Sequence, residues 1–434
     1  MQAVTPSRFL ASEAQGLLTR LRRVRPLSAT MPAVASASVG APALRAIDQM
    51  LICQREDLGR HVTRFLARLK HERLTGESAR AVQREFVFLK LRFNATLDQL
   101  DIFADVMTQR SEHETGSWIG GLDVAASDAM QIESYRGEMP LAVTYLDRGH
   151  GAAIRRARTR LPGGAPSPVA IVRIPRERMV GTGIASSLVH EAGHQVAGLL
   201  DLVASLRRDL GRARTARSNS LDPWELWQRW ISEILADAWA IGKLGPAATS
   251  GLMGVVSLPL AFVFRVGLDG PHPFPWIRVV LSCRVGNTVY PDPIWSQLER
   301  SWRTMYPLDG APAKTREIVQ QLESTMDPFI DRMLSHRVSR ANGDELRRIV
   351  RHGSRTPRAL RSSRARVGMH PHRVAALSPT RALAYLGLAR LDGALPAEQE
   401  HRLVGQLLQH WALSRALCDG VCARCAAETS APIK

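Results

Sequence analysis

Two histidines four residues apart, in an otherwise apolar segment, place the strongest constraint on how this chain folds. The segment reads His190-Glu191-Ala192-Gly193-His194, with Leu188 and Val189 before it and Val196, Leu199 and Leu200 after it. On a helix, positions i and i+4 share a face, so both imidazoles can point at a single ion. A buried helix tolerates such polar groups only where they are paired or ligated. An ordinary helix with two surface histidines is the alternative.

A second segment offers a third metal ligand. It reads Trp230-Ile-Ser-Glu-Ile-Leu-Ala-Asp-Ala-Trp239, so Glu233 and Asp237 share one helical face among tryptophan and aliphatic residues. Catalytic zinc usually takes three protein ligands and keeps one position open for water. We therefore expect His190, His194 and Glu233 to bind Zn²⁺, with Asp237 accepting the second ring N–H of a ligand histidine. A solvated acidic face on an amphipathic helix is the alternative.

Glu191 lies between the two histidines but is rotated away from their face of the helix. It can therefore act on a metal-bound water instead of on the metal. Zinc lowers the pKa of its bound water toward ~7, and a neighbouring carboxylate can take the proton and pass it to a leaving amine. This arrangement predicts a zinc-dependent hydrolase.

Three blocks in this order resemble the gluzincin metallopeptidases. The first two are the histidine segment and Glu233-x-x-Ala-Asp237, and the third is His272-Pro-Phe-Pro-Trp-Ile-Arg278, which is similar to the His-Pro-x-x-x-x-Arg signature of the HtpX and CAAX-prenyl protease branch. The resemblance covers about residues 165–280. It implies a zincin-like α+β domain, peptide-bond hydrolysis, Glu191 as general base, His272 as donor to the developing oxyanion and Arg278 as an anchor near the site.

The resemblance also implies a role for the predicted strand Val169–Ile174, which precedes the first metal helix. In zincins an edge strand at this place binds the substrate backbone as an added strand. The chain departs from the HtpX branch because it has no convincing membrane span. Its longest uncharged stretch, 244–264, is broken by Pro246 and Pro259 and favours a buried core helix or hairpin.

The pattern along the chain predicts a helix-rich α+β protein in five parts. Residues 1–42 read as a flexible leader, or as a targeting tag, because they are acid-poor and rich in Ala, Ser and Pro. Apolar residues at helical spacing predict a helical hairpin over 43–110. The zincin-like catalytic domain is expected over 111–335, a basic linker over 336–375, and a helical region with a cysteine cluster over 376–434.

Five cysteines are too few, and odd in number, for a disulfide-stapled domain, which favours a reducing compartment. No secretory h-region is recognisable, so we expect a cytoplasmic protein, with export by a non-standard route left open. Three of the cysteines, Cys418, Cys422 and Cys425, follow His410 closely enough to form a small structural zinc site. Free or redox-active thiols are the alternative.

The formal net charge is +18, and half of it lies between Arg337 and Arg373, where eleven arginines face only Asp344 and Glu345. This stretch could contact phosphate or an acidic protein, or it could be a solvated, partly disordered linker. The rival function is therefore a nucleic-acid- or protein-binding protein with a structural or degenerate zinc site. Glu191 argues against it, because a structural zinc has no use for a base beside an open position.

Overall fold

The computed structural model describes residues 5–31, 33–71, 74–148, 151–176, 181–212, 222–267 and 270–429, without the side chains of 113–114 and 421–429. The chain is helix-rich with a small sheet, which confirms the predicted class at that level. It divides into two compact units. Unit 1 comprises residues 1–120, 156–170 and 413–434, and unit 2 comprises 121–155 and 171–412. Among the described helices, none combines the length and apolar character needed to cross a membrane.

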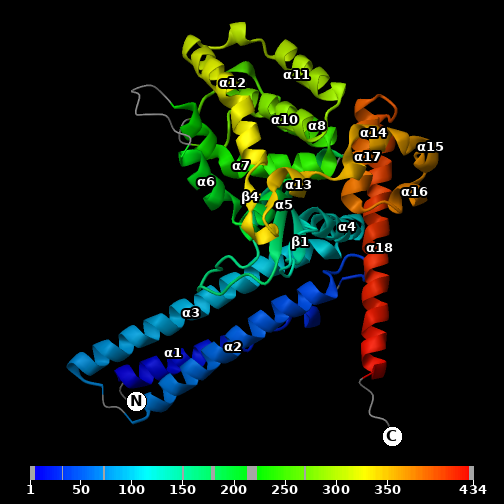
Figure 1. The fold of residues 1–434 in the computed structure, drawn as a ribbon. Helices are drawn as coiled ribbons and strands as arrows, with labels where there is room; N and C mark the ends of the chain where they lie inside the picture. The colour runs from blue at the N-terminus through cyan, green and yellow to red at the C-terminus, as the bar shows by residue number, and fades with distance from the viewer. Residues whose placement is uncertain are drawn as a thin grey trace. The chain divides into compact units, whose positions relative to one another are not determined.

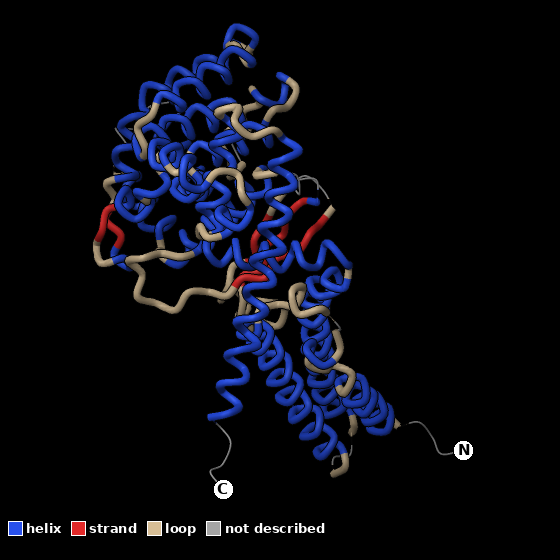
Figure 2. The backbone as a smooth tube through the Cα atoms, turned by 90° about the vertical axis from the view of Figure 1, so that its right-hand side faces the viewer, coloured by secondary structure: helices blue, strands red, loops and turns tan. Residues whose placement is uncertain are grey.

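Unit 1 is built on three long helices that lie side by side, α1 (Pro6–Leu21), α2 (Ala41–Leu69) and α3 (Gly76–Thr108) (Figures 1 and 2). The predicted hairpin 43–110 corresponds to α2 and α3. Helix α3 is capped at its first turn, where the Ser78 hydroxyl accepts a hydrogen bond from Thr75 N–H at 2.9 Å. Phe65 of α2 and Phe86 of α3 pack with ring centroids 6.1 Å apart.

The expectation of a flexible leader over residues 1–42 is wrong for most of that range. Helix α1 buries Leu10, Ala14, Leu17 and Leu21 in the same apolar cluster as Phe65 and Phe86. These residues recur every three or four positions, so they form one apolar face. The average composition of the segment, dominated by its Ala/Ser/Pro-rich end, concealed this periodicity.

Unit 2 contains a three-stranded sheet of β1 (Ala142–Asp147), β2 (Ala153–Arg155) and β3 (Ala170–Pro175) in the order β1-β3-β2. Strands β2 and β3 are antiparallel, with Ile154 opposite Val172. The strand predicted over 169–174 is therefore central, and its expected role as a substrate-binding edge is wrong. Strands β1 and β2 occupy the two edges instead, and β2 is only three residues long and carries no clear alternation.

The helices that carry the candidate ligands are α5 (Gly183–Leu199) and α7 (Pro223–Leu244). They approach so closely that a Cβ on Gly193 would lie 2.8 Å from the Cα of Ala236, which explains the glycine between the two metal-spaced histidines. Asp222 caps α7 by accepting a hydrogen bond from Trp224 N–H at 2.9 Å. Close packing of these two helices fixes the spacing of the side chains between them.

The N-terminus of α5 is capped by a residue that lies near the end of unit 2 in the sequence. Glu400, in α18 (Ala397–Thr429), is buried and accepts hydrogen bonds from the Thr182 backbone N–H at 3.1 Å and from its hydroxyl. A carboxylate at this position also meets the positive end of the helix dipole.

Seven further helices complete the unit or pass through it: α4 (His113–Met130), α6 (Leu202–Gly211), α8 (Pro246–Val256), α9 (Leu260–Val263), α10 (Pro275–Val289), α11 (Pro293–Met305) and α12 (Ala313–Leu334). The uncharged stretch 244–264 forms α8 and α9. Helix α8 packs against α5, since a Cβ on Gly251 would lie 2.2 Å from the Ser186 hydroxyl oxygen.

Residues 336–375, expected to form a basic linker, are folded. They contain β4 (Arg337–Val338), β5 (Asp344–Glu345), α13 (Leu346–Val350), α14 (Pro357–Ser362), α15 (Arg364–Val367) and α16 (Pro371–Ala375), and α17 (Pro379–Leu391) follows. Buried apolar residues between the arginines anchor them, among them Leu346, Leu360 and Val374. Acidic partners outside the stretch neutralise part of the charge, as Asp392 does for Arg361.

Candidate metal centre

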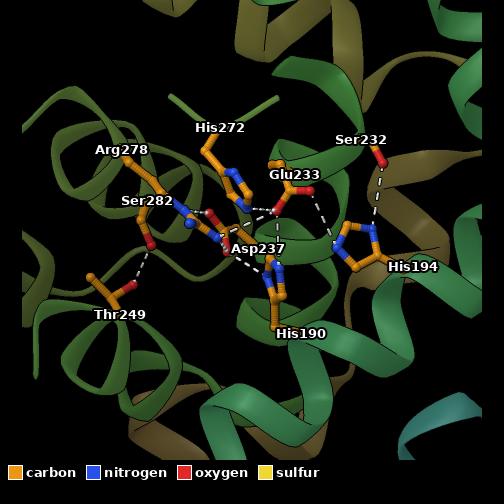
Figure 3. Close-up of polar contacts among 9 residues, drawn as sticks. All are labelled: His190, His194, Ser232, Glu233, Asp237, Thr249, His272, Arg278 and Ser282. Atoms are coloured by element: carbon orange, nitrogen blue, oxygen red, sulfur yellow. Dashed lines mark hydrogen bonds and ion pairs between the residues drawn. The ribbon is translucent and has the colours of Figure 1, made fainter. Parts of the chain in front are cut away.

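Helices α5 and α7 bring His190, His194 and Glu233 together at one point (Figure 3). One nitrogen or oxygen atom of each residue lies within 4.8 Å of those of the other two. The Nε2 atom of His190 is 3.2 Å from Oε2 of Glu233, and Nε2 of His194 is 3.5 Å from Oε1. Within the described part of the chain, no other three histidine, cysteine or acidic residues converge in this way. The side chains expected to be ligands from sequence are therefore neighbours.

The environment of Glu233 shows that these residues fit a metal ion. The side chain is buried, with 7% of its surface exposed, and its Oε2 has no hydrogen-bond partner among the described residues. His190 and His272 approach this oxygen at 3.2 and 3.1 Å, but neither contact has hydrogen-bond geometry. Two imidazole nitrogens and a carboxylate oxygen are ligands suited to zinc and similar divalent metals. The cluster could bind such an ion through three protein ligands.

Asp237 fixes the orientation of His190. Its Oδ1 lies 2.8 Å from Nδ1 of the imidazole, so Nδ1–H donates to the carboxylate and Nε2 faces Glu233. Burial opposes a charge on His190, but the carboxylates of Asp237 and Glu233 raise its pKa to about 9. The acidic groups of the site therefore stabilise positive charge at this position.

Arg278, on α10, holds Asp237 in turn. Its Nε and Nη2 donate to the two carboxylate oxygens at 2.7 and 2.9 Å. Burial would raise the pKa of Asp237, but Arg278 and His190 hold it well below its usual range. Arg278, expected as an anchor near the site, is thus a positioning residue for Asp237, and through it for the candidate ligand His190.

Sequence patterns did not indicate the neighbour of His194, the second candidate ligand histidine. The Oγ atom of Ser232 lies 3.4 Å from Nδ1 of His194 (Figure 3). Ser232 directly precedes Glu233 on α7, but no spacing rule singles out a serine at this position. Only the packing of α7 on α5 shows that the two side chains meet.

Glu191 lines a pocket that opens beside the candidate ligands, and it is not one of the three converging residues. Its side chain is 7% exposed, and burial raises its pKa. His272 borders the same pocket, with 55% of its side chain exposed. A buried carboxylate with an elevated pKa and an accessible imidazole thus lie at the edge of one cavity.

The pocket has a volume of about 170 Å³ and is formed by four helices of unit 2 together with the residues just before β2. Its lining residues are Gly151 and Ala152; Ser186, Ser187, His190 and Glu191 of α5; Asp237 and Ala240 of α7; Ala248, Leu252 and Val255 of α8; His272; and Arg278 and Ser282 of α10. His190, Glu191 and His272 therefore border a defined cavity, whereas His194 and Glu233 are not among its lining residues.

Half of the predicted second metal site falls outside the described residues. His410 and Cys418 lie on α18, where the Cys418 thiol is exposed. The side chains of Cys422 and Cys425 lie outside the described residues. The structural zinc site proposed for this segment remains a prediction from sequence.

Comparison with known proteins adds no further constraint. No protein-family model, curated protein or solved structure matches this chain. The functional argument therefore rests on the geometry of the His190–His194–Glu233 cluster and on the resemblance of the three sequence blocks.

Proposed function

We propose that this chain is a zinc-dependent metallopeptidase with His190, His194 and Glu233 as ligands. The observation that carries the proposal is the convergence of these three side chains beside a pocket that Glu191 also lines. When bound, zinc would supply a Lewis acid that polarises the scissile carbonyl and makes water acidic enough to lose a proton near neutral pH. The identity of the metal as zinc, and not another divalent ion, is also part of the proposal.

Glu191 serves as the general base. The elevated pKa of its buried carboxylate brings it closer to the working pH of a catalyst that must both accept and release a proton. The attacking water gives its proton to Glu191 as its oxygen bonds to the carbonyl carbon. The C–N bond then breaks, and the same proton passes to the amine nitrogen. The water oxygen stays on the new carboxylic acid.

His272 donates a hydrogen bond to the oxygen of the tetrahedral species. Its ring borders the pocket and is accessible, and its Nε2 lies 3.1 Å from Glu233, so the imidazole reaches the ligand cluster. A donor aimed at developing negative charge contributes in the transition state and not in the ground state.

The edge strand β2 offers a place for the substrate backbone. Gly151 and Ala152, immediately before this strand, line the pocket, and β2 packs against α5. An extended peptide can add to a free strand edge through main-chain hydrogen bonds. This replaces β3 in the role that the resemblance suggested.

The rival function as a nucleic-acid- or protein-binding protein has less support. Several arginines of the stretch 337–373 are engaged in ion pairs, including Arg347 with Asp331 and Arg361 with Asp292. A purely structural zinc site would leave Glu191 and the adjoining pocket without a role. We therefore favour catalysis at this site.

The test compares wild-type protein with Glu191→Gln by metal analysis and by hydrolysis of an unbiased peptide library. We expect the variant to retain about one zinc per chain and to lose nearly all turnover, because an amide cannot accept the proton. Glu225→Gln, the same change in the first turn of α7, should leave zinc content and turnover unchanged. If Glu191→Gln remained fully active, the proposed mechanism would have to be abandoned.

A further inference from the structure

We propose that the pocket beside Glu191 binds one apolar substrate side chain of leucine or phenylalanine size, and that Leu252 and Val255 set its size limit. The inference rests on the proposed peptidase function and specifies the substrate class. The side chain belongs to one of the two residues that flank the cleaved bond, because Glu191 and His272 both line the pocket.

One wall of the pocket is aliphatic. Ala240 of α7 and Ala248, Leu252 and Val255 of α8 line it with methyl and methylene groups. Leu252 is buried, with 9% of its surface exposed, so it is held in place by the surrounding helices. Removing an apolar side chain from water against such a wall stabilises the complex by about 25 cal/mol per Å² of buried apolar surface.

Several polar groups that line the pocket already have partners. The Ser282 hydroxyl pairs with Thr249 at 2.7 Å, and the Ser186 hydroxyl donates to the Gly183 carbonyl at 3.0 Å. Arg278 and Asp237 neutralise each other through their two hydrogen bonds. A charged substrate side chain packed against Leu252 and Val255 would therefore lose its hydration without gaining a counter-ion from these groups, at a cost of several kcal/mol.

The volume limits what the pocket can hold. At about 170 Å³ it is similar to an apolar protein cavity of about 150 Å³ that accommodates benzene. A leucine side chain or a phenyl ring fits this space, whereas an indole needs more room. Leu252 and Val255 contribute the largest aliphatic side chains to the lining, so their size determines how much space remains.

The pocket serves only one side of the candidate metal site. Figure 3 shows Ser282 and Thr249 beyond Arg278 and His190, whereas His194 and Ser232 lie on the other side of Glu233. Neither His194 nor Ser232 lines the pocket. A peptide whose carbonyl is attacked near Glu233 can thus place one flanking side chain in the pocket but not both.

The experiment measures kcat/KM for peptides varied at the two positions that flank the cleaved bond. At one of them, leucine and phenylalanine should exceed alanine by about 10-fold or more, and aspartate and lysine by about 100-fold. Leu252→Ala should raise the relative rate with tryptophan by about 10-fold. Val255→Phe should abolish the preference for leucine over alanine while alanine peptides remain substrates.

Leu258→Ala is the matched control, because Leu258 is exposed and lies outside the pocket. Each variant is also checked for zinc content and thermal unfolding, so that a change in specificity is separated from a loss of fold. If leucine, aspartate and tryptophan were cleaved equally well at both positions, the pocket assignment would be overturned, and the metallopeptidase proposal would stand.

A binding measurement keeps the two proposals distinguishable. Dissociation constants of N-acetylated alanine peptides carrying a single leucine, tryptophan or aspartate are measured by calorimetry with zinc-loaded Glu191→Gln. The pocket is supported if the leucine peptide binds more tightly than the other two, and if adding Leu252→Ala makes the tryptophan peptide the tightest binder. This holds even if wild type cleaves no peptide. Equal affinities for all three peptides overturn it.

Discussion

Arg278 holds Asp237 by two hydrogen bonds, at 2.7 and 2.9 Å, and the same carboxylate accepts a third from Nδ1 of His190 at 2.8 Å. The three residues come from α10, α7 and α5. Asp237 therefore orients the candidate ligand His190, and Arg278 in turn orients Asp237. The packing of α10 consequently matters for the ligand geometry on α5.

Asp237→Asn should keep the fold and weaken metal affinity by about 10–100-fold, the usual cost of losing the partner of a ligand histidine. Competition with a chromogenic chelator measures the affinity. Asp327→Asn, on the exposed surface of α12, should leave it unchanged. Arg278→Lys should also weaken it, because a lysine cannot make both hydrogen bonds. If Asp237→Asn bound the metal with wild-type affinity, Asp237 would have no role in metal binding.

Substitution of the ligands themselves should abolish stoichiometric metal binding. His190→Ala, His194→Ala and Glu233→Ala each leave two ligands where three are needed. Elemental analysis of the purified variants provides the measurement, and it also identifies the metal. Glu225→Ala, on the same helix as Glu233, serves as control. Retention of one metal per chain by Glu233→Ala would show that another group is the third ligand.

His272→Ala should retain the metal and reduce kcat by about 10²–10³-fold with little change in KM, because the oxyanion exists only after water has attacked. Steady-state kinetics beside a metal assay tests this. A rise in KM alone would instead assign His272 to ground-state binding. Loss of metal would indicate that its 3.1 Å contact with Glu233 supports the ligand.

Leu17→Ala should destabilise unit 1 by about 2–5 kcal/mol, because the side chain is fully buried between α1 and its neighbours. Phe9→Ala on the same helix should change stability by less than about 0.5 kcal/mol, since Phe9 is 55% exposed. Urea unfolding followed by circular dichroism measures both. Equal small effects would mean that α1 is not part of the core.

Lys243 should make stability depend on pH in the alkaline range. Burial lowers its pKa from 10.5 to about 8 in the folded chain, so between these values the unfolded chain binds more protons. The free energy of unfolding should therefore rise from pH 8 to 10, by up to about 3 kcal/mol. Lys243→Met should flatten this slope, and Lys314→Met, at an exposed site, should not. A slope that persists in Lys243→Met would assign it to other groups.

The ligand cluster was predictable because its determinants are local. An i, i+4 histidine pair and an i, i+4 carboxylate pair place their side chains on one helical face whatever the rest of the chain does. The contact between these two helical faces is not a local feature of the sequence. Buried carboxylates and imidazoles, however, need hydrogen-bond, ion-pair or metal partners, and few are available in an apolar environment. Contact between Glu233 and the two histidines followed from that need.

Other features depend on contacts that no periodicity reveals. The partners of β3 fix its central position, and β2 is too short to show alternation. The pocket wall at Leu252 lies in a stretch whose sequence indicates only burial. The fold of 336–375 depends on carboxylates elsewhere, such as Asp292 and Asp392, that pair with its arginines. Composition therefore overstated the flexibility of this segment.

The cap that Glu400 places on α5 has a consequence for biosynthesis. Glu400 and Thr182 are 218 residues apart, so the helix that carries His190 and His194 leaves the ribosome long before its cap does. A nascent chain that ends after α17 already contains all three candidate ligands and the pocket helices. It still lacks Glu400, so the N-terminus of α5 has no carboxylate to accept the Thr182 hydrogen bonds. Helix α5, which carries two of the candidate ligands, therefore reaches its final anchorage only when α18 has been translated and has docked.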